Sequence, residues 1–145
     1  DAHLWIIGKG DPKNYQNLIR VLGVQKKITF VGSIKDTNSW YQMADLMVLP
    51  TNYDPFSNSC LEALACGCPV MTTKCNGASE CITPENGFIL NDPEDIENQD
   101  TIDWIAQLKS LNRHNISQSV EERTTEKEMS EYLQLLHVGK AMRDE

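Results

Sequence analysis

The sequence predicts an α/β fold in which a parallel sheet carries helices on both faces. Two observations lead to this prediction. Short apolar runs recur along the chain without alternating polar residues, which is typical of parallel strands that are buried on both faces. Segments with helical periodicity separate these runs. We expect one α/β domain over residues 1–112, followed by a helical extension over residues 113–145.

The first third of the chain begins with a strand and a capped helix. HLWIIG (His3–Gly8) is an apolar run that ends in glycine, and we expect it to be a buried strand. Asp11 and Pro12 have the residue types of an N-cap and a first helical residue, and Gly23 is expected to end that helix. A second strand and a short helix are expected at Lys27–Gly32 and Asp36–Ala44.

The remaining elements continue the alternation. LMVLP (Leu46–Pro50) is a third strand that its proline ends, and the next helix has Leu61, Leu64 and Ala65 on one face. Two further strands are expected at Pro69–Thr73 and Gly87–Leu90. Two more helices are expected, one with its apolar positions from Trp104 to Leu111 and one over Thr125–Met142.

The charge of the chain excludes some classes of partner. With 21 acidic and 13 basic residues the net charge is −8, which argues against nucleic acid because phosphate binding needs clustered Lys and Arg. No apolar run approaches the roughly 18 residues of a membrane span. No signal peptide opens the chain, so we expect a cytoplasmic location. Since the sequence starts at Asp1 without methionine, we also expect it to be part of a longer protein.

Five cysteines fall within 22 residues of each other. Their number is odd, and a disulfide framework would pair them. A zinc site is the alternative, but the spacing gives no Cys-x-x-Cys pair and no histidine lies nearby. We therefore expect free thiols at Cys60, Cys66, Cys68, Cys75 and Cys81.

YDPFSNSCLEALACGCPV (Tyr53–Val70) places polar residues where ligands usually bind. In open parallel sheets that place is beyond the carboxyl ends of the strands, and this stretch follows the third strand. Asp54 and Glu62 are separated by seven residues, on either side of a helix start. Strong N-cap types occupy this start, at Ser57, Asn58 and Ser59. The free N–H groups of a helix start, together with the helix dipole, favour an anion.

A ligand with a diphosphate between two sugars would use both the helix start and the two carboxylates. Such a ligand is a nucleotide sugar. Two structural alternatives remain at this point. Ser59 and Glu62 also have the spacing of a capping box, in which Glu62 would only cap its own helix. Asp54 is also a residue type that stabilises turns.

A longer pattern adds a family resemblance. The segments FVGSI, ADLMVLPTNYDPFSNSCLEALACGCPVMTT, NGASECI and NGFIL occur in this order within residues 2–110. With them the chain resembles the C-terminal, donor-binding domain of retaining GT-B glycosyltransferases of family 4 (group 1), nearest to bacterial enzymes of lipopolysaccharide-core or surface-glycan synthesis. The resemblance implies a Rossmann-like sheet that is the C-terminal half of a GT-B fold and lacks its first strand and helix.

The resemblance also implies roles for single residues. Asp54 would contact the donor sugar near the reacting carbon, as the catalytic residue, and Glu62 would bind the ribose hydroxyls. Ser33 and Ile34 would contact the base through their main chain. The backbone N–H groups of Ser57, Asn58 and Ser59 would hold the distal phosphate or the sugar, and Phe56 would be a further donor-binding residue. Gly8 and Gly10 would let the backbone turn close to the cleft.

The activity that the resemblance implies is transfer of a sugar, of hexosyl type, from a nucleoside diphosphate to a glycan or lipid-linked acceptor with retention. We expect no cofactor and no metal, since the sequence has no Asp-x-Asp. The chain departs from the family pattern at Asp54, usually glutamate, and at Ser57, usually glycine. The family's diphosphate-binding Arg and Lys and its acceptor domain are missing here, so we expect this chain alone to be inactive.

Two further expectations complete the functional prediction. The full-length protein could associate peripherally with the inner face of the membrane. The alternative function is a Rossmann-like nucleotide-binding module without transferase activity.

Overall fold

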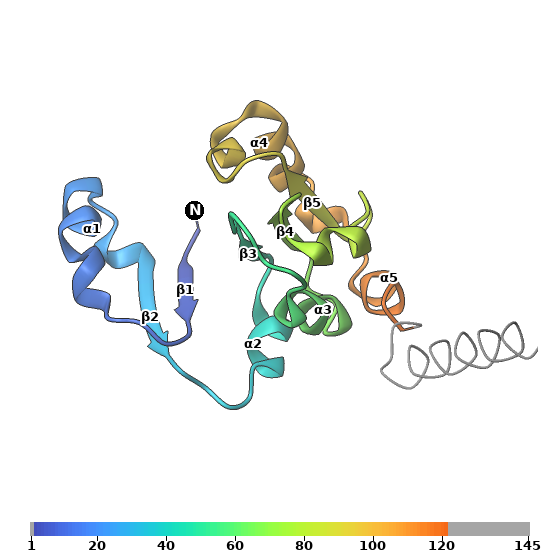
Figure 1. Ribbon diagram of the computed structural model, residues 1–145, viewed down its shortest axis with the longest axis horizontal. Coiled ribbons are helices and arrows are strands. Elements are labelled where there is room, and N and C mark those ends of the chain that lie inside the picture. The colour runs from blue at the N-terminus through green and yellow to red at the C-terminus, as the bar shows by residue number, and fades with distance from the viewer. Residues whose placement is uncertain (1, 122–145) are drawn as a thin grey trace, which may run out of the picture. The chain divides into compact units, whose positions relative to one another are not determined.

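The computed structural model describes residues 2–121, which form two compact units (Figure 1). Unit 1 covers residues 1–37, and unit 2 starts at Asn38. The helix expected over Thr125–Met142 lies outside the described residues. None of the helices within residues 2–121 combines the length and the apolar character that a membrane-spanning segment requires.

Unit 1 is a two-stranded parallel sheet with a helical connection. β1 (Leu4–Ile7) pairs with β2 (Ile28–Gly32). The connection contains the short 3-10 helices η1 (Pro12–Tyr15) and η2 (Gln25–Lys27) and the helix α1 (Gln16–Leu22). The Asp11 side chain caps η1 by accepting from the N–H of Lys13 at 3.0 Å, and Gly23 ends α1 at φ 68°. Both predicted helix boundaries are confirmed, with the first turn in 3-10 geometry.

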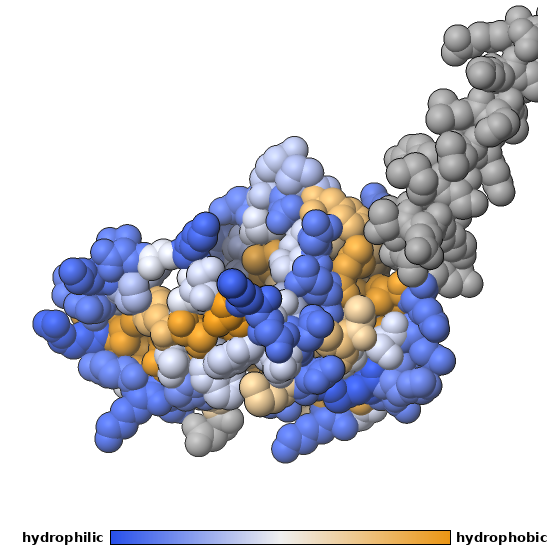
Figure 2. All heavy atoms as spheres, turned by 90° about the horizontal axis from the view of Figure 1, so that it is seen from below, coloured by the Kyte–Doolittle hydropathy of each residue, from blue (hydrophilic) through white to orange (hydrophobic). Residues whose placement is uncertain are grey.

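The prediction that the first strand is buried is wrong. The side chains of Leu4, Trp5, Ile6 and Ile7 keep 49, 46, 38 and 37% of their surface exposed. A two-stranded sheet with one helical connection has too little structure to cover both of its faces. Tyr15 of η1 stacks on Phe30 of β2, with ring centroids 6.1 Å apart. Apolar atoms of unit 1 therefore reach the surface (orange, left in Figure 2).

Unit 2 is built on a three-stranded parallel sheet in the order β3-β4-β5. The strands are β3 (Met47–Leu49), β4 (Val70–Thr73) and β5 (Gly87–Leu90). The helices are α2 (Asn38–Met43), α3 (Asn58–Ala65), α4 (Gln99–Ala106) and α5 (Arg113–Gln118). Three 3-10 helices follow strands or helices, η3 (Gly77–Cys81), η4 (Pro93–Glu97) and η5 (Leu108–Ser110). The expected strands are thus confirmed, but the helix expected to reach Leu111 ends at Ala106.

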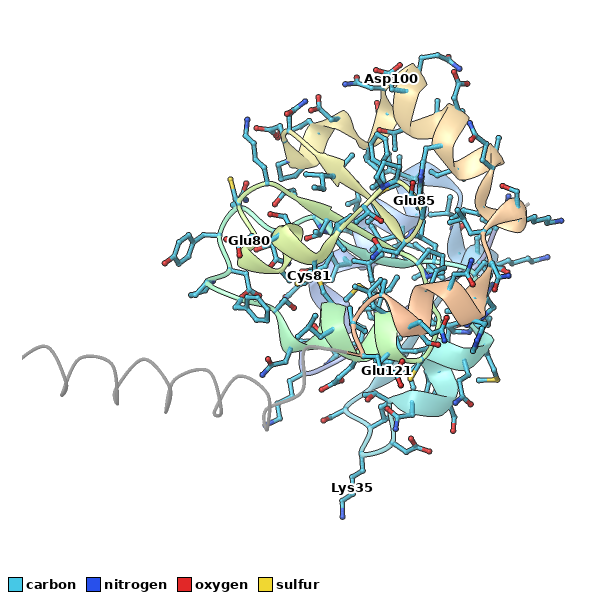
Figure 3. All side chains as sticks on the ribbon, turned by 90° about the vertical axis from the view of Figure 1, so that its right-hand side faces the viewer. Lys35, Glu80, Cys81, Glu85, Asp100 and Glu121 are labelled. Carbon is cyan, nitrogen blue, oxygen red and sulfur yellow. The ribbon has the colours of Figure 1, made fainter. Side chains whose placement is uncertain are left out.

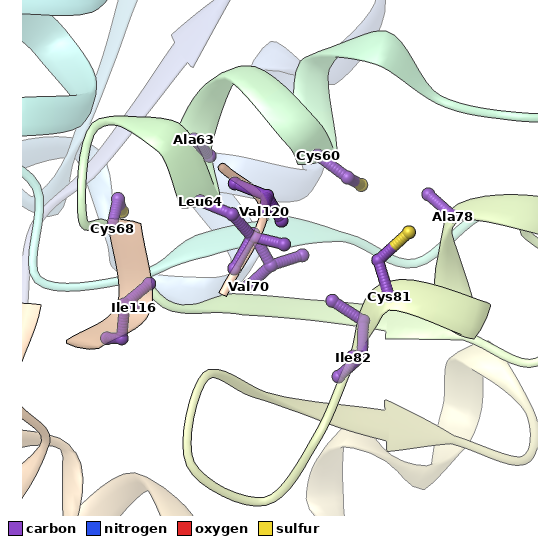
Figure 4. Packing of buried hydrophobic residues seen from close by; sticks show 10 residues of the cluster. All are labelled: Cys60, Ala63, Leu64, Cys68, Val70, Ala78, Cys81, Ile82, Ile116 and Val120. Atoms are coloured by element: carbon purple, nitrogen blue, oxygen red, sulfur yellow. The ribbon is translucent and has the colours of Figure 1, made fainter. Parts of the chain in front are cut away.

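Helices cover both faces of this sheet. Val70 of β4 belongs to a buried cluster with residues of α3, η3 and α5 (Figure 4). The next residue, Met71, pairs in register with Phe88, whose ring lies 5.5 Å from Trp104 of α4. Since successive strand side chains point to opposite faces, α4 packs on the face away from α3. The cluster is Cys60, Ala63, Leu64, Cys68, Val70, Ala78, Cys81, Ile82, Ile116 and Val120.

α5 lies beyond residue 112 and packs into unit 2. Ile116 is fully buried in the cluster. The guanidinium of Arg113 donates to the carbonyl oxygens of Tyr41, Gln42 and Ala44 at 3.0, 3.1 and 2.8 Å. It thereby pairs carbonyls at the end of α2 that have no partner within the helix. The domain boundary expected after residue 112 stays a prediction.

The loops after β3 and β4 are joined beyond the ends of these strands. Asp54 and Asn76 form a parallel bridge, in which the Asp54 N–H donates to Cys75 O at 3.2 Å and the Gly77 N–H to Asp54 O at 2.9 Å. A Cβ atom on Gly77 would lie 2.0 Å from the carbonyl oxygen of Pro55. Only glycine therefore permits this close contact of the two loops.

We predict that Gly77→Ala destabilises the protein by about 1–3 kcal/mol, because a methyl group must displace backbone rather than a flexible side chain. Urea unfolding measures the loss. Gly10→Ala is the matched control, since a Cβ at Gly10 meets no atom within 4 Å. Equal unfolding midpoints for Gly77→Ala and the unchanged protein would contradict the close contact.

The five cysteines are free thiols that differ in exposure. Cys75 is exposed, whereas Cys60 and Cys68 are completely buried. Burial raises the pKa of the Cys68 thiol to about 11. Within the described residues no group of three or more metal-ligating side chains is present.

We predict that an alkylating agent at pH 8 modifies Cys75 first and Cys68 last. With a pKa of about 11, only about one Cys68 thiol in a thousand is the reactive thiolate at that pH. Peptide mass spectrometry after timed quenching gives the rate at each cysteine. If Cys68 is labelled as fast as Cys75 in the folded protein, the core around Cys68 opens readily and the prediction is wrong.

Candidate functional site

Six of the ten predicted site residues lie in unit 2, on the loop that leads from β3 into α3. The backbone of this loop is fixed by the bridge between Asp54 and Asn76. α3 begins at Asn58, directly after the loop, with Ser57 as its N-cap. The six residues are Asp54, Phe56, Ser57, Asn58, Ser59 and Glu62. They therefore share one short segment at the carboxyl edge of the sheet.

The N-cap position of α3 decides between the two interpretations of Glu62, ligand binding and a capping box. Ser57 has extended backbone dihedrals of −81° and 108°, and its hydroxyl contacts the Ser59 hydroxyl at 2.8 Å instead of capping the helix. Ser59 is then the second helical residue. A capping box with Glu62 would need Ser59 at the N-cap. The alternative of a capping box between Ser59 and Glu62 is therefore wrong.

Asn76, which is not among the predicted site residues, holds the start of α3. Its side chain is completely buried. Oδ1 accepts from the N–H groups of Ser57 and Ala78 at 3.2 and 3.0 Å. Nδ2 donates to Thr72 Oγ1 at 2.9 Å and contacts Cys60 Sγ at 3.5 Å. The Asn-Gly pair after a strand signals a turn, but nothing in the sequence indicates that this asparagine is buried beneath another loop.

This contact corrects part of the predicted anion-binding site. We expected the N–H groups of Ser57, Asn58 and Ser59 to face a ligand, but that of Ser57 is already used by Asn76. The N–H groups of Asn58 and Ser59 lie in the first turn of α3, where no acceptor exists within the helix. Asn58 is exposed and Ser59 is half-buried. The N–H groups of Asn58 and Ser59 are therefore the two of the three predicted donors that Asn76 does not use.

The two carboxylates differ in their surroundings. Asp54 is half-buried, and its Oδ1 accepts from the N–H of Phe56 at 3.1 Å, so Asp54 does stabilise a turn. This turn uses one of the two carboxylate oxygens, which leaves acceptor capacity for a ligand. Glu62 is exposed on α3. Burial, followed by the negative charge of Glu62, raises the pKa of Tyr41 on α2 to about 12.

The other four predicted residues lie in unit 1, where β1 and β2 end. The N–H of Gly8, directly after β1, donates to Gly32 O at 3.0 Å, and Gly8 has a φ of 145° that favours glycine. Gly10 follows two residues later. Ser33 and Ile34 come directly after β2. In each unit, the predicted residues thus gather at or just beyond the carboxyl ends of parallel strands, where ligands of such sheets bind.

Unit 2 has two further features near α3, the 3-10 helix η3 and a cavity. η3 follows Asn76 and carries Glu80 and Cys81 (Figure 3). A cavity of 490 Å³ lies between α3 and α5 and contains none of the predicted site residues. It is lined by Leu61, Ala65, His114, Ser117, Gln118, Val120 and Glu121.

The chain is similar to proteins that are named as glycosyltransferases. An uncharacterized glycosyltransferase of Methanocaldococcus jannaschii, MJ1607, is 38% identical over 107 residues, which are 72% of this chain and 27% of that protein. The lipopolysaccharide core biosynthesis glycosyltransferase LpsE of Rhizobium meliloti is 31% identical over 62% of this chain and 27% of its own length. The chain therefore spans about a quarter of the length of these relatives.

A solved structure has a similar fold, and a family model matches most of the chain. Anabaena HepE, solved in complex with UDP-glucose, superimposes with a TM-score of 0.67 at 24% identity and covers 91% of this chain and 40% of its own. This likeness shows the fold, a Rossmann-like arrangement found in the C-terminal half of GT-B proteins. The family model described as glycosyl transferases group 1 matches residues 1–108. Since this match covers most of the chain, the chain belongs to the glycosyl transferases group 1 family.

Proposed function

We propose that this chain binds the donor in a protein that transfers a sugar, of hexosyl type, from a nucleoside diphosphate to a glycan or lipid-linked acceptor with retention. One observation carries the proposal: the N–H groups of Asn58 and Ser59, which have no acceptor within α3, follow a loop carboxylate, Asp54, and precede a helix carboxylate, Glu62, along the chain. The similarity to LpsE and HepE supports it, since one is named for lipopolysaccharide core synthesis and the other was solved with UDP-glucose.

Each part of the segment has a task in this proposal. The diphosphate lies at the start of α3, where N–H donors and the helix dipole favour negative charge. Glu62 accepts hydrogen bonds from the ribose hydroxyls. Asp54 accepts from the donor sugar with the oxygen that its turn does not use. The two carboxylates thus orient hydroxyl groups on both sides of one phosphate-binding point.

The chemical step follows from this placement. As the bond between the sugar and the diphosphate breaks, negative charge grows on the leaving phosphate. The N–H groups of Asn58 and Ser59 stabilise that charge without moving, because the fold already holds them in place. The acceptor oxygen bonds to the sugar carbon that the diphosphate leaves, and the leaving phosphate takes the proton of the acceptor hydroxyl, so no side-chain base is required. The acceptor binds to a part of the protein outside this chain, which by itself does not turn over substrate.

The proposal is tested with the whole protein that contains this chain. Saturation-transfer NMR against UDP-, GDP- and ADP-sugars identifies the donor, and a turnover assay with the bound donor follows. Donor binding and sugar transfer support the proposal. Binding without any transfer would instead favour a nucleotide-binding module, and no binding of any nucleotide sugar would overturn the proposal.

We predict that Glu62→Ala weakens nucleotide-sugar binding by about 1.5–3 kcal/mol, the usual worth of a hydrogen bond to a charged group. Calorimetry measures the affinity, and a melting curve measures stability. Glu97→Ala is the control, because Glu97 is an exposed acid at the end of η4. If affinity is unchanged and only the melting temperature falls, Glu62 acts on the stability of α3 and not on the ligand.

We also predict that transfer does not require a divalent metal. The sequence has no Asp-x-Asp pair to hold a metal against a diphosphate, and the start of α3 can stabilise the leaving group instead. Turnover should be the same in EDTA and in manganese. Activity that is lost in EDTA and restored by manganese would contradict this prediction.

A further inference from the structure

Lys74 lies at the carboxyl edge of the unit 2 sheet, and hydrogen bonds hold its backbone in place. It comes directly after β4, and its side chain is exposed. Its N–H donates to Leu90 O at 3.0 Å, which ties it to β5. On the other side, Cys75 O accepts from the N–H of Asp54 at 3.2 Å. The backbone at Lys74 is therefore held between the end of β5 and the loop that carries Asp54.

Lys74 also differs from the other cations of unit 2. In the described part of this unit, Lys and Arg occur at Lys74, Lys109 and Arg113. The guanidinium of Arg113 is bound to three carbonyl oxygens at the end of α2. Lys109 belongs to η5, far along the chain from the loops at the carboxyl edge. The residues that the structure describes give Lys74 no ion pair, so its charge is available to a ligand.

The proposed ligand needs such a charge. Asp54 and Glu62 are carboxylates next to the start of α3, and they repel a diphosphate that binds there. The helix start offsets this with only about half of an elementary charge. The chain adds acidity of its own, since its net charge is −8. A full positive charge close to α3 would offset part of the negative charge of the two carboxylates.

The backbone connections place Lys74 close to Asn76, which contacts the start of α3. Lys74 is two residues before Asn76, and two trans peptide units span at most about 7 Å. The side chain of Asn76 is itself 3.2 Å from the N–H of Ser57, the N-cap of α3. Lys74 therefore lies on the same short loop as the residue that holds the start of α3, and a lysine ammonium on its flexible four-carbon stem binds phosphate as a point charge.

We infer that Lys74 is a further donor-binding residue, whose ammonium pairs with a phosphate of the nucleoside diphosphate at the start of α3. The inference rests on the proposed function and adds to it. The pair supplies positive charge from unit 2 itself. It acts on the phosphates and not on the base or the ribose, so its loss should affect diphosphates and leave nucleosides unaffected.

The test compares a nucleoside diphosphate with its nucleoside in the whole protein that contains this chain. UDP, GDP and ADP are titrated by calorimetry, and the one that binds is compared with uridine, guanosine or adenosine. Lys74→Gln should raise the dissociation constant of the diphosphate about tenfold, as for a lost charged hydrogen bond. The constant of the nucleoside should not change. Lys74→Arg should keep most of the affinity, and Lys109→Gln, the matched control, should keep all of it.

The outcomes separate this inference from the proposed function. If the unchanged protein binds none of the three diphosphates, the proposed function fails and the inference fails with it. If the diphosphate binds and Lys74→Gln binds it equally well, only the inference is wrong. If Lys74→Gln weakens the diphosphate and the nucleoside by the same factor, Lys74 acts on the fold and the phosphate pair is likewise refuted. Melting curves of all variants show whether each is folded.

Discussion

The buried amide of Asn76 is the constraint on which the candidate site depends. A polar side chain without contact to water costs free energy unless each of its groups is hydrogen-bonded. Asn76 meets this condition by bonding to Ser57, Ala78 and Thr72, which belong to different segments of unit 2. Its Nδ2 also lies against the sulfur of Cys60 in α3. Any shift of α3 along its axis would leave part of this buried amide unpaired, so the start of the helix has one favourable position.

Other contacts extend this order along the carboxyl edge of the sheet. Backbone pairing of β3 with β4 ends at Leu49 and Thr72. The hydroxyl groups of Thr72 and Thr73 then donate to the carbonyl oxygens of Leu49 and Thr51. The bridge between Asp54 and Asn76 continues the connection. The loop that carries the candidate residues is thus held by several bonds before a ligand arrives, which lowers the entropy that binding must overcome.

The same segment combines opposite preferences within a few residues. Helix N–H groups favour an anion, whereas the carboxylates of Asp54 and Glu62 disfavour it and favour hydroxyl groups. A ligand with one kind of group alone would use only part of the segment. A ligand that carries both an anionic group and hydroxyl groups would use the whole segment. Both acids are always present. The net charge near the helix start therefore depends on which cations lie close to it.

The sequence by itself determined the elements and their order, since each depends on neighbouring residues. The N-cap at Asp11 and the left-handed Gly23 set the limits of a helical connection locally. The spacing of Asp54 and Glu62 around a helix start was also visible, as was the parallel sheet from its apolar runs. Tertiary structure decided what depends on distant partners. Ser57 is the N-cap of α3, and its N–H donates to the side chain of Asn76, 19 residues later in the sequence. The periodicity of the sequence cannot reveal such a bond. In the same way, the exposure of Leu4 to Ile7 depends on how much structure covers β1, which the apolar character of the strand does not encode.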